Sequence, residues 1–506
     1  MPLINSLVSI LGAKRLKYID KFRKQPFEVQ EEVLKGLIET ASNTVWGNMY
    51  DFASIKSIET FQQRVPLQEY NQAVPFIDRV RHGEANVLWP SDIRWLAKSS
   101  GTTDSKSKFI PISQESLDDV HFQGGKDTLI IYTSCYPETG IFNGKGLTLG
   151  GSHQIDRFSE KISTGDLSAI LIENIPFWAD LFRTPTQKVA LIPDFELKMQ
   201  RIAQEALTEN VTYFAGVPSW NLVLMKYILE QTGKQNILEV WPEMELFIHG
   251  GVNFTPYREQ YRRLFPSEGM HYMETYNASE GFFALQDDPK TNDMLLMLDY
   301  GIFYEFIPMD KFFDKDVTPL TVADVKVGVN YAIVITTNGG LWRYIIGDTV
   351  EFTSIYPHKI RITGRTKHYI NTFGEEIIVD NAEQAIKAAC EKTGAIVKEY
   401  TAGPIFMQDD AKGGHEWLFE FDKHPESIEE FTDALDQALI AINSDYEAKR
   451  FKNITLQRPL VRVFNPGAFY QWLKVAGKLG GQHKIPRLFN SREYVDKLLE
   501  INKSIK

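Results

Sequence analysis

A stretch rich in small and hydroxyl-bearing residues, 99–103, follows the strand-like run Ile93 to Ala97 after one intervening residue, Lys98. Gly101 lets the backbone turn inward and expose successive N–H groups. Lys108 adds a compact positive charge. The hydroxyl donors are those of Ser99, Ser100, Thr102 and Thr103. The GxxxxGKS or GxxxxGKT spacing of a Walker A loop is absent, so the stretch predicts another kind of loop that holds phosphate oxygens. Taken alone, such residues are more often a solvated turn.

A second group places an aromatic ring, a hydroxyl and a carboxylate in one short segment, Tyr276-Asn-Ala-Ser279-Glu280. A tyrosine ring can stack on a purine, and a carboxylate can help to hold Mg²⁺ against the phosphates of ATP. Taken alone, an acid such as Glu280 is more often a helix cap or a surface residue.

A third group is Arg343-Tyr-Ile-Ile-Gly347-Asp348, in which the glycine ends a strand-like run. The carboxylate of Asp348 can accept hydrogen bonds from both hydroxyls of a ribose, as acidic residues do in dinucleotide-binding folds. An aspartate in an ordinary turn is the commoner case for this group by itself.

The overall composition excludes several other functions. The 506 residues carry 55 Lys and Arg against 66 Asp and Glu, a net charge of −11, which disfavours nucleic acid as a partner. Cys135 and Cys390 are far apart, and the ten histidines lack metal-ligand spacing. No apolar run approaches the roughly 20 residues of a membrane span, and the first residues lack the order of a secretory signal. We therefore expect a cytoplasmic protein with neither a disulfide framework nor a zinc site.

Two α/β units are predicted to position these groups. Helical spacing dominates residues 15–90, and strand-like runs then alternate with amphipathic stretches up to about residue 350, which favours mainly parallel strands. These runs are Ile93 to Ala97, Leu129 to Tyr132, Val211 to Phe214, Leu246 to His249 and Ile302 to Ile307. A smaller unit follows, with strands at Ile377 to Val379 and Glu416 to Phe421 and helices at Ala382 to Cys390 and Ile428 to Ile442. We place a large domain at 1–362, a hinge at 363–371 and a small domain at 372–506.

Four motifs in this order resemble the adenylate-forming superfamily of acyl-CoA ligases, peptide-synthetase adenylation domains and luciferases. Within it, the chain is most similar to the acyl-acid amido synthetases known in plants as the auxin-responsive Gretchen Hagen family, and to their bacterial relatives. The fourth motif is Gly481-Gln-His-Lys484-Ile-Pro-Arg487, and the resemblance spans residues 90–490. Asp104, Ser105 and Ile345 depart from the plant pattern. The implied fold is a large adenylate-forming domain with mixed or parallel sheets flanked by helices, joined by a hinge to a smaller α/β domain.

The resemblance implies an ATP-dependent ligase that uses Mg²⁺. It adenylates a small carboxylic acid, releases pyrophosphate, and transfers the acyl group to an amino acid to form an amide. Residues 99–103 and Lys108 would hold phosphates, Glu280 would place Mg²⁺, Tyr276 would pack on adenine and Asp348 would hold the ribose. Ser279, Arg343 and Arg365 complete the implied nucleotide contacts. Lys484 would swing towards the adenylate, although residues 474–487 could equally be an exposed basic face.

The acyl pocket and the acceptor are less sharply defined. Residues beside the motifs could line an apolar slot, although each is also typical of a plain core; they are Val217, Val252, Phe254 and Phe283, with Trp178 and Phe214 as further candidates. An acyl-CoA ligase, an enzyme that serves an acyl carrier, and a non-catalytic nucleotide sensor remain alternatives. The sequence names neither the acid, the amine nor the oligomeric state.

Overall fold

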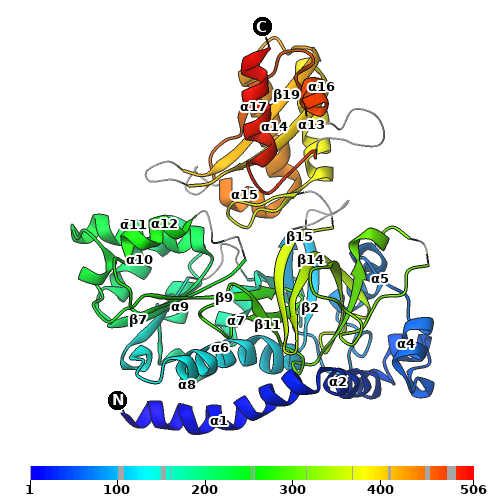
Figure 1. The fold of residues 1–506 in the computed structure, drawn as a ribbon, viewed down its shortest axis with the longest axis vertical. Coiled ribbons are helices and arrows are strands. Elements are labelled where there is room, and N and C mark those ends of the chain that lie inside the picture. The colour runs from blue at the N-terminus through cyan, green and yellow to red at the C-terminus, as the bar shows by residue number, and fades with distance from the viewer. Residues whose placement is uncertain are drawn as a thin grey trace.

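The computed structural model describes residues 2–100, 107–149, 155–159, 161–251, 254, 257–314, 316–366, 369–407, 412–450, 456–475 and 486–505. Only the backbone is described for residues 2–11, 99, 100, 107, 178, 195, 219 and 380. The N-terminal helices and the large sheets form the lower part of the molecule, and the C-terminal segment, yellow to red, forms the upper part (Figure 1).

Helices lead into the fold, as the spacing of residues 15–90 predicts. They are α1 (Pro2–Lys24), α2 (Pro26–Ala41), α3 (Val45–Met49), α4 (Ile58–Arg64) and α5 (Tyr70–Arg81). Proline begins α2, where its missing N–H costs nothing. Buried Gln30 fixes this helix to the sheet: its amide nitrogen donates to the carbonyls of Leu298 and Ile302, at 2.7 and 2.8 Å, and its amide oxygen accepts from the N–H of Tyr304.

The largest sheet in the described residues has eleven strands in the order β12-β13-β14-β15-β11-β10-β9-β8-β7-β3-β6 (Figure 1). The strands β6, β3, β7, β8 and β9 run parallel, and the others pair antiparallel. The bounds are β3 Lys145–Thr148, β6 Arg183–Thr184, β7 Val211–Gly216, β8 Leu246–His249, β9 His271–Ala278, β10 Gly281–Leu285, β11 Met294–Leu296, β12 Ile302–Pro308, β13 Asn330–Thr337, β14 Tyr344–Ile355 and β15 His358–Arg365.

The prediction of a mixed α/β fold is confirmed, but the expectation of mainly parallel strands is wrong. Parallel neighbours need long crossovers, whereas β9 joins β10 through a two-residue turn at Ser279 and Glu280, so the chain returns antiparallel. Helices lie on both sides of the parallel strands (Figure 1). They are α6 (Phe122–Cys135), α7 (Leu167–Glu173), α8 (Phe177–Asp180), α9 (Gln187–Ala190), α10 (Phe195–Ala206), α11 (Pro218–Thr232) and α12 (Arg258–Leu264). The run Leu129 to Tyr132, predicted as a strand, lies inside α6, because a short apolar run does not distinguish the two structures.

A smaller sheet flanks residues 101–106. Its order is β2-β1-β5-β4, with β1 at Trp95–Ser100, β2 at Ser107–Ile112, β4 at Asp156–Arg157 and β5 at Ser163–Gly165. The strands β1 and β2 form an antiparallel pair in which Ser99 lies opposite Lys108. The predicted phosphate loop therefore connects two paired strands.

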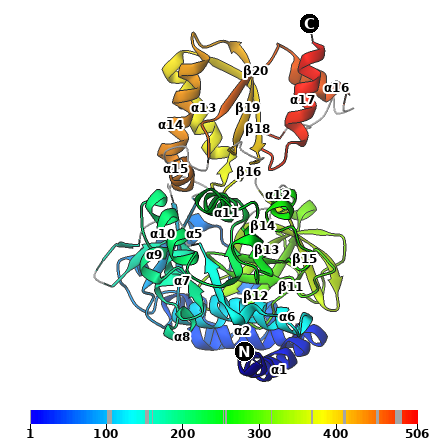
Figure 2. The ribbon, with the colours of Figure 1, turned by 90° about the vertical axis from the view of Figure 1, so that its left-hand side faces the viewer.

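The C-terminal segment forms a three-stranded sheet, β18-β19-β20, with helices on both faces (Figure 2). Because strand side chains alternate, Trp417 and Phe419 pack towards α13 and α14, and Leu418 packs towards α16 and α17. The elements are β16 Tyr369–Ile370, β17 Ile377–Ile378, α13 Val379–Thr393, β18 Ile396–Ile405, β19 Gly414–Lys423, α14 Ile428–Ile442, α15 Ser444–Arg450, β20 Leu460–Val463, α16 Ala468–Val475 and α17 Glu493–Ser504. The strands and helices predicted here are all present.

Hydrogen bonds and a shared apolar cluster join the upper and lower parts. The indole N–H of Trp220 donates to the carbonyl of Phe373 at 3.1 Å, and the hydroxyl of Tyr257 donates to the carbonyl of Thr372 at 2.9 Å. Phe373 and Tyr257 belong to one apolar cluster that also contains Trp417. The segment after β15 is therefore held against the lower part. No helix among the described residues has the length and apolar character needed to cross a membrane.

His121, just before α6, is buried and makes the fold sensitive to acid. Its Nδ1 lies 3.1 Å from Oδ1 of Asn277, and its Nε2 has no hydrogen-bond partner. Burial lowers the pKa of His121 to about 4, against about 6.5 in an unfolded chain. The folded state therefore resists a proton that the unfolded state accepts.

We expect the free energy of unfolding to have its full value above about pH 6.5 and to fall by up to about 3 kcal/mol as the pH drops towards 4. The reason is that His121 takes up a proton more readily in the unfolded chain. Urea unfolding at several pH values should give a flatter profile for His121→Gln than for the native protein. The exposed His424→Gln is the control and should keep the native slope. Equal slopes for the native protein and His121→Gln would contradict this assignment.

Candidate active site

Lys108 lies at the centre of a buried charged cluster. The antiparallel pair β1 and β2 places it opposite Ser99, and only 6% of the residue is exposed. Burial lowers the pKa of its ammonium group, and the carboxylates of Glu280, Glu376 and Asp348 oppose that shift. Ser99 and Ser100 are placed on β1 by their backbone, whereas Gly101, Thr102 and Thr103 lie outside the described residues.

The second motif is at the end of β9. The Tyr276 hydroxyl donates to Oδ2 of Asp348 at 2.5 Å, and its ring lies edge-on to Phe283. Ser279 and Glu280 form the following turn and are partly buried. Burial raises the pKa of Glu280, while the charge of Lys108 lowers it. The turn therefore places the carboxylate of Glu280 where it interacts with the ammonium group of Lys108.

Asp348 and Arg365 face one another across β14 and β15. The guanidinium Nε of Arg365 lies 3.2 Å from Oδ1 of Asp348, so both oxygens of this carboxylate have a partner. Gly347 adopts φ +98°, and a side chain there would begin 3.0 Å from Nη2 of Arg365. Glycine at this position lets the arginine lie against the strand. Each Asp348 oxygen keeps a further lone pair for a ribose hydroxyl.

Arg365 also pairs with Glu376, which follows the predicted hinge. Burial opposes the charge of Arg365, but Glu376 and Asp348 raise its pKa. Burial raises the pKa of Glu376, whereas the charges of Arg365 and Lys108 lower it. None of the motifs predicted a role for Glu376. The consecutive acids at 375 and 376 were the available signal.

A narrow cavity is lined by three members of the charged cluster, Lys108, Arg365 and Glu376. Its walls come from α5, β2, β14 and the segment after β15, and include Glu69, Tyr70, Lys108, Phe312, Ile345, Ile346, Gly347, Arg365, Thr366, Glu376 and Ile378. The ammonium of Lys108 lies 5.8 Å from the ring centre of Tyr70. Glu69 and Tyr70 gave no local signal, because only the tertiary structure brings the start of α5 to this place.

Arg343 differs from its predicted nucleotide role. It is buried, adopts φ +45°, and its guanidinium forms two bonds of 2.9 and 2.8 Å to Glu305. It also donates to the carbonyls of Gln62 and Val65, both at 2.7 Å. These contacts occupy the guanidinium within the core, so the structure gives Arg343 a packing role instead of a contact with ATP.

The predicted pocket residues do not form one group. Val217 precedes α11, near Gly251, and buried Phe254 stacks on His249 with ring centres 4.2 Å apart. Phe283 lies in the core against Tyr304 and edge-on to Tyr276, and Phe214 is stacked on Phe247. Both are fully buried, and their pocket role stays a prediction. Val252 and the side chain of Trp178 lie outside the described residues, as does Lys484.

His249 is a polar residue of this region that the pocket prediction missed. It ends β8, its Nδ1 has no hydrogen-bond partner, and burial together with Arg258 lowers its pKa to about 3. A neutral imidazole therefore lies beside Phe254. The signal in the sequence was its place before two glycines at a strand end.

The family is decided by three matches along the chain. Residues 15–270 match the GH3 family N-terminal domain, 295–365 the GH3 family central domain and 380–493 the GH3 family C-terminal domain. The protein belongs to the GH3 family. This GH3 protein is 25% identical to the putative indole-3-acetic acid-amido synthetase GH3.9 of Arabidopsis thaliana, over 96% of its own chain and 95% of that relative. It is 23% identical to the jasmonoyl-L-amino acid synthetase JAR6 of Nicotiana attenuata, over 93% of each chain.

Solved structures agree with the fold. The GH3.15 acyl acid amido synthetase aligns with a TM-score of 0.62 at 17% identity, over 97% of this chain and 95% of that one. A 2-hydroxyisobutyryl-CoA ligase aligns with a TM-score of 0.58 at 15% identity, over 96% and 94%. The predicted family and adenylate-forming fold are confirmed. The predicted class, a ligase that forms an amide through an acyl-adenylate, is confirmed too, and such enzymes use ATP.

Replacing Arg343 should affect stability before catalysis. Arg343→Met leaves the carboxylate of Glu305 buried without its positively charged partner, with only the amide of Gln62 still donating to it, so we expect the free energy of unfolding in urea to fall by roughly 3–5 kcal/mol. The double variant Arg343→Met, Glu305→Met removes both charges and should recover much of that loss. If Arg343→Met kept native stability but bound ATP more weakly, Arg343 would have the predicted role in nucleotide binding.

Proposed function

We propose that this GH3 protein activates a small carboxylic acid with ATP and transfers the acyl group to an amino acid. The observation that carries the proposal is the convergence of Lys108, Glu280, Asp348, Arg365 and Glu376 on one buried cluster. The names of the relatives support the substrate classes, since they include indole-3-acetic acid-amido and jasmonoyl-L-amino acid synthetases and a 4-substituted benzoates-glutamate ligase.

Adenylation requires two anions to meet, because the carboxylate of the acid attacks the α-phosphate of ATP. Lys108 and Arg365 supply positive charge near the reacting phosphate, and the strands hold both in place before the reaction begins. The Tyr276 hydroxyl donates a hydrogen bond to the Asp348 carboxylate, so the ring and the carboxylate lie close enough to take up the adenine and the ribose of one nucleotide. Ser279 and residues 99–103 complete the proposed nucleotide contacts.

Mg²⁺ fits this donor set. The three carboxylates that act on Lys108 outnumber the cations there, so a triphosphate alone would meet excess negative charge. The described residues contain no group of three His, Cys, Asp or Glu side chains that could hold a metal alone. Mg²⁺ often binds through one or two carboxylates together with substrate phosphates. Glu280 would be the protein ligand, and the ion would neutralise the leaving pyrophosphate.

The second half-reaction needs access for an amine. Arg365 lies within the predicted hinge, 363–371, and its ion-pair partner Glu376 follows it, so a rotation between these two residues would separate the charges. The domain limits 1–362 and 372–506, the swing of Lys484 and a cytoplasmic location are part of this proposal. Val217 and Phe254, at the carboxyl ends of β7 and β8, are the proposed wall for the acid.

Exchange of labelled pyrophosphate into ATP, measured over a panel of carboxylic acids, tests the first half-reaction. The best acid should then give an amide by mass spectrometry when amino acids are added. A thioester formed with CoA instead would identify an acyl-CoA ligase, the function of the neighbour with the TM-score of 0.58. ATP binding with no exchange for any acid would overturn the proposal.

Lys108→Met should slow acid-dependent pyrophosphate exchange by about 100-fold or more, because it removes a preorganised charge from the reaction centre. The control is Lys145→Met. Lys145 is also partly buried and pairs with Glu209 at 2.7 Å, but it stands at the beginning of β3, away from the charged cluster. It should keep the native rate. Similar rates for the two variants would show that Lys108 has no special part in adenylation.

A further inference from the structure

Tyr344 carries a hydroxyl that the described structure does not use. The residue begins β14 and is 1% exposed, and its Oη has no hydrogen-bond partner. Burying a hydroxyl without a hydrogen bond is unfavourable. Phenylalanine would fill the same space without that cost, so the hydroxyl is not explained by packing.

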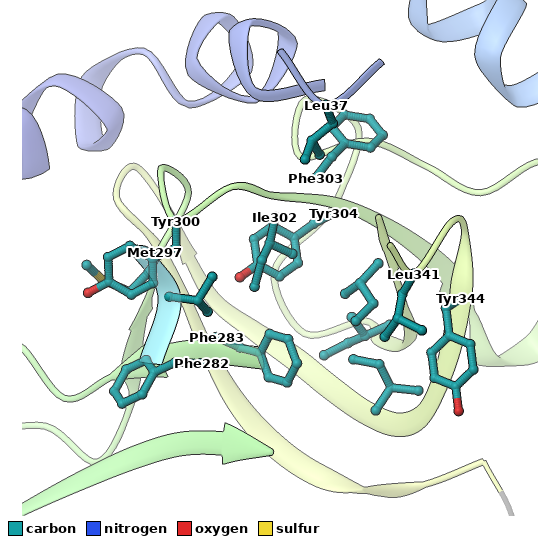
Figure 3. Packing of buried hydrophobic residues seen from close by; sticks show 14 of the residues in the cluster. Leu37, Phe282, Phe283, Met297, Tyr300, Ile302, Phe303, Tyr304, Leu341 and Tyr344 are labelled. Carbon is teal, nitrogen blue, oxygen red and sulfur yellow. The ribbon is translucent and has the colours of Figure 1, made fainter. Parts of the chain in front are cut away.

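The hydroxyl points out of the apolar core. In Figure 3 the ring of Tyr344 lies at the margin of the cluster, beyond Leu341, and its oxygen is directed away from the other labelled side chains. A backbone bridge to Gln68 holds the residue, because the N–H of Ile345 donates to the Gln68 carbonyl at 2.8 Å. The next residues, Glu69 and Tyr70, line the cavity of Lys108.

The charges around Tyr344 are those of the active site. Burial raises the pKa of Tyr344 well above its ordinary value, Glu280, Tyr70 and Glu69 raise it further, and the charge of Arg365 lowers it. The phenol is therefore neutral and keeps its proton as a donor. Three of these four neighbours also line the cavity with Lys108.

We propose that Tyr344 Oη donates a hydrogen bond to an anionic oxygen of the bound reactants, either a phosphate oxygen of ATP or a carboxylate oxygen of the acid. This inference rests on the proposed adenylation reaction and adds a substrate-contacting residue to it. Lys108 and Arg365 provide charge at the cluster, whereas Tyr344 provides a neutral, directional donor fixed to the same strand as Asp348.

The chain contains a matched control. Tyr304 on β12 is also fully buried, and its hydroxyl likewise has no hydrogen-bond partner. Its ring lies inside the same cluster, where it overlaps Ile302 in the view of Figure 3. Burial and the distant charge of Asp299 raise its pKa, and no residue of the Lys108 cluster contributes. Tyr304 thus shares the chemistry of Tyr344 without its location.

Tyr344→Phe and Tyr304→Phe should be compared with the native enzyme in three measurements. These are ATP affinity by calorimetry without acid, acid-dependent pyrophosphate exchange, and the urea midpoint of unfolding. Both variants should be at least as stable as the native protein, since each loses an unsatisfied hydroxyl. Only Tyr344→Phe should lose function, by roughly 10- to 100-fold, as expected for one hydrogen bond to a charged group.

The measurement in which Tyr344→Phe loses function identifies the oxygen that the hydroxyl contacts. Weaker ATP binding without acid points to a phosphate, and unchanged ATP binding with a raised KM for the acid or slower exchange points to the carboxylate. Native values for Tyr344→Phe in all of these would overturn the inference, as would equal losses in both variants or a fall in the urea midpoint of Tyr344→Phe. Absence of exchange in the native enzyme would refute the proposed function separately, and unchanged ATP affinity of Tyr344→Phe would then refute this inference as well.

Discussion

The paired charges of Arg365 hold the site in its present form. A guanidinium that is largely removed from water requires partners, and this one lies between Asp348 on β14 and Glu376 after the predicted hinge. Asp348 in turn accepts from Tyr276 on β9. One cation thus fixes the relative positions of three segments. Any movement of the C-terminal segment that opens the site must find new partners for this charge.

The position of this network follows from the topology of the large sheet. The strand β9 is parallel to β8 on one side and antiparallel to β10 on the other, so the chain changes its mode of connection at that strand. Ligands of α/β proteins commonly bind where a sheet changes its connection pattern, because the loops there diverge and leave room. Tyr276 and Glu280 lie at that point, and β14 and β15 bring their partners from the antiparallel side.

Two consecutive residues show how structure and function divide along one strand. The Arg343 guanidinium forms its hydrogen bonds within the core, to Glu305 and to the carbonyls of Gln62 and Val65. The hydroxyl of Tyr344 makes none. Saturated hydrogen bonding indicates a packing role, whereas an unsatisfied buried donor beside a charged cavity indicates a group that meets its partner when a ligand binds.

Local patterns in the sequence determined much of this protein. The strand Leu246–His249 and the helix Ile428–Ile442 follow from apolar spacing, and the ordered motifs identified the family. Tertiary structure alone decided the antiparallel half of the sheet, the helical state of 129–132, the core positions of Arg343 and Phe283, and the entry of Tyr70 and Glu376 into the site. The physical reason is distance along the chain. Periodicity reports which face of an element is buried, but partners far apart in sequence are selected by packing and by the need to pair buried charge.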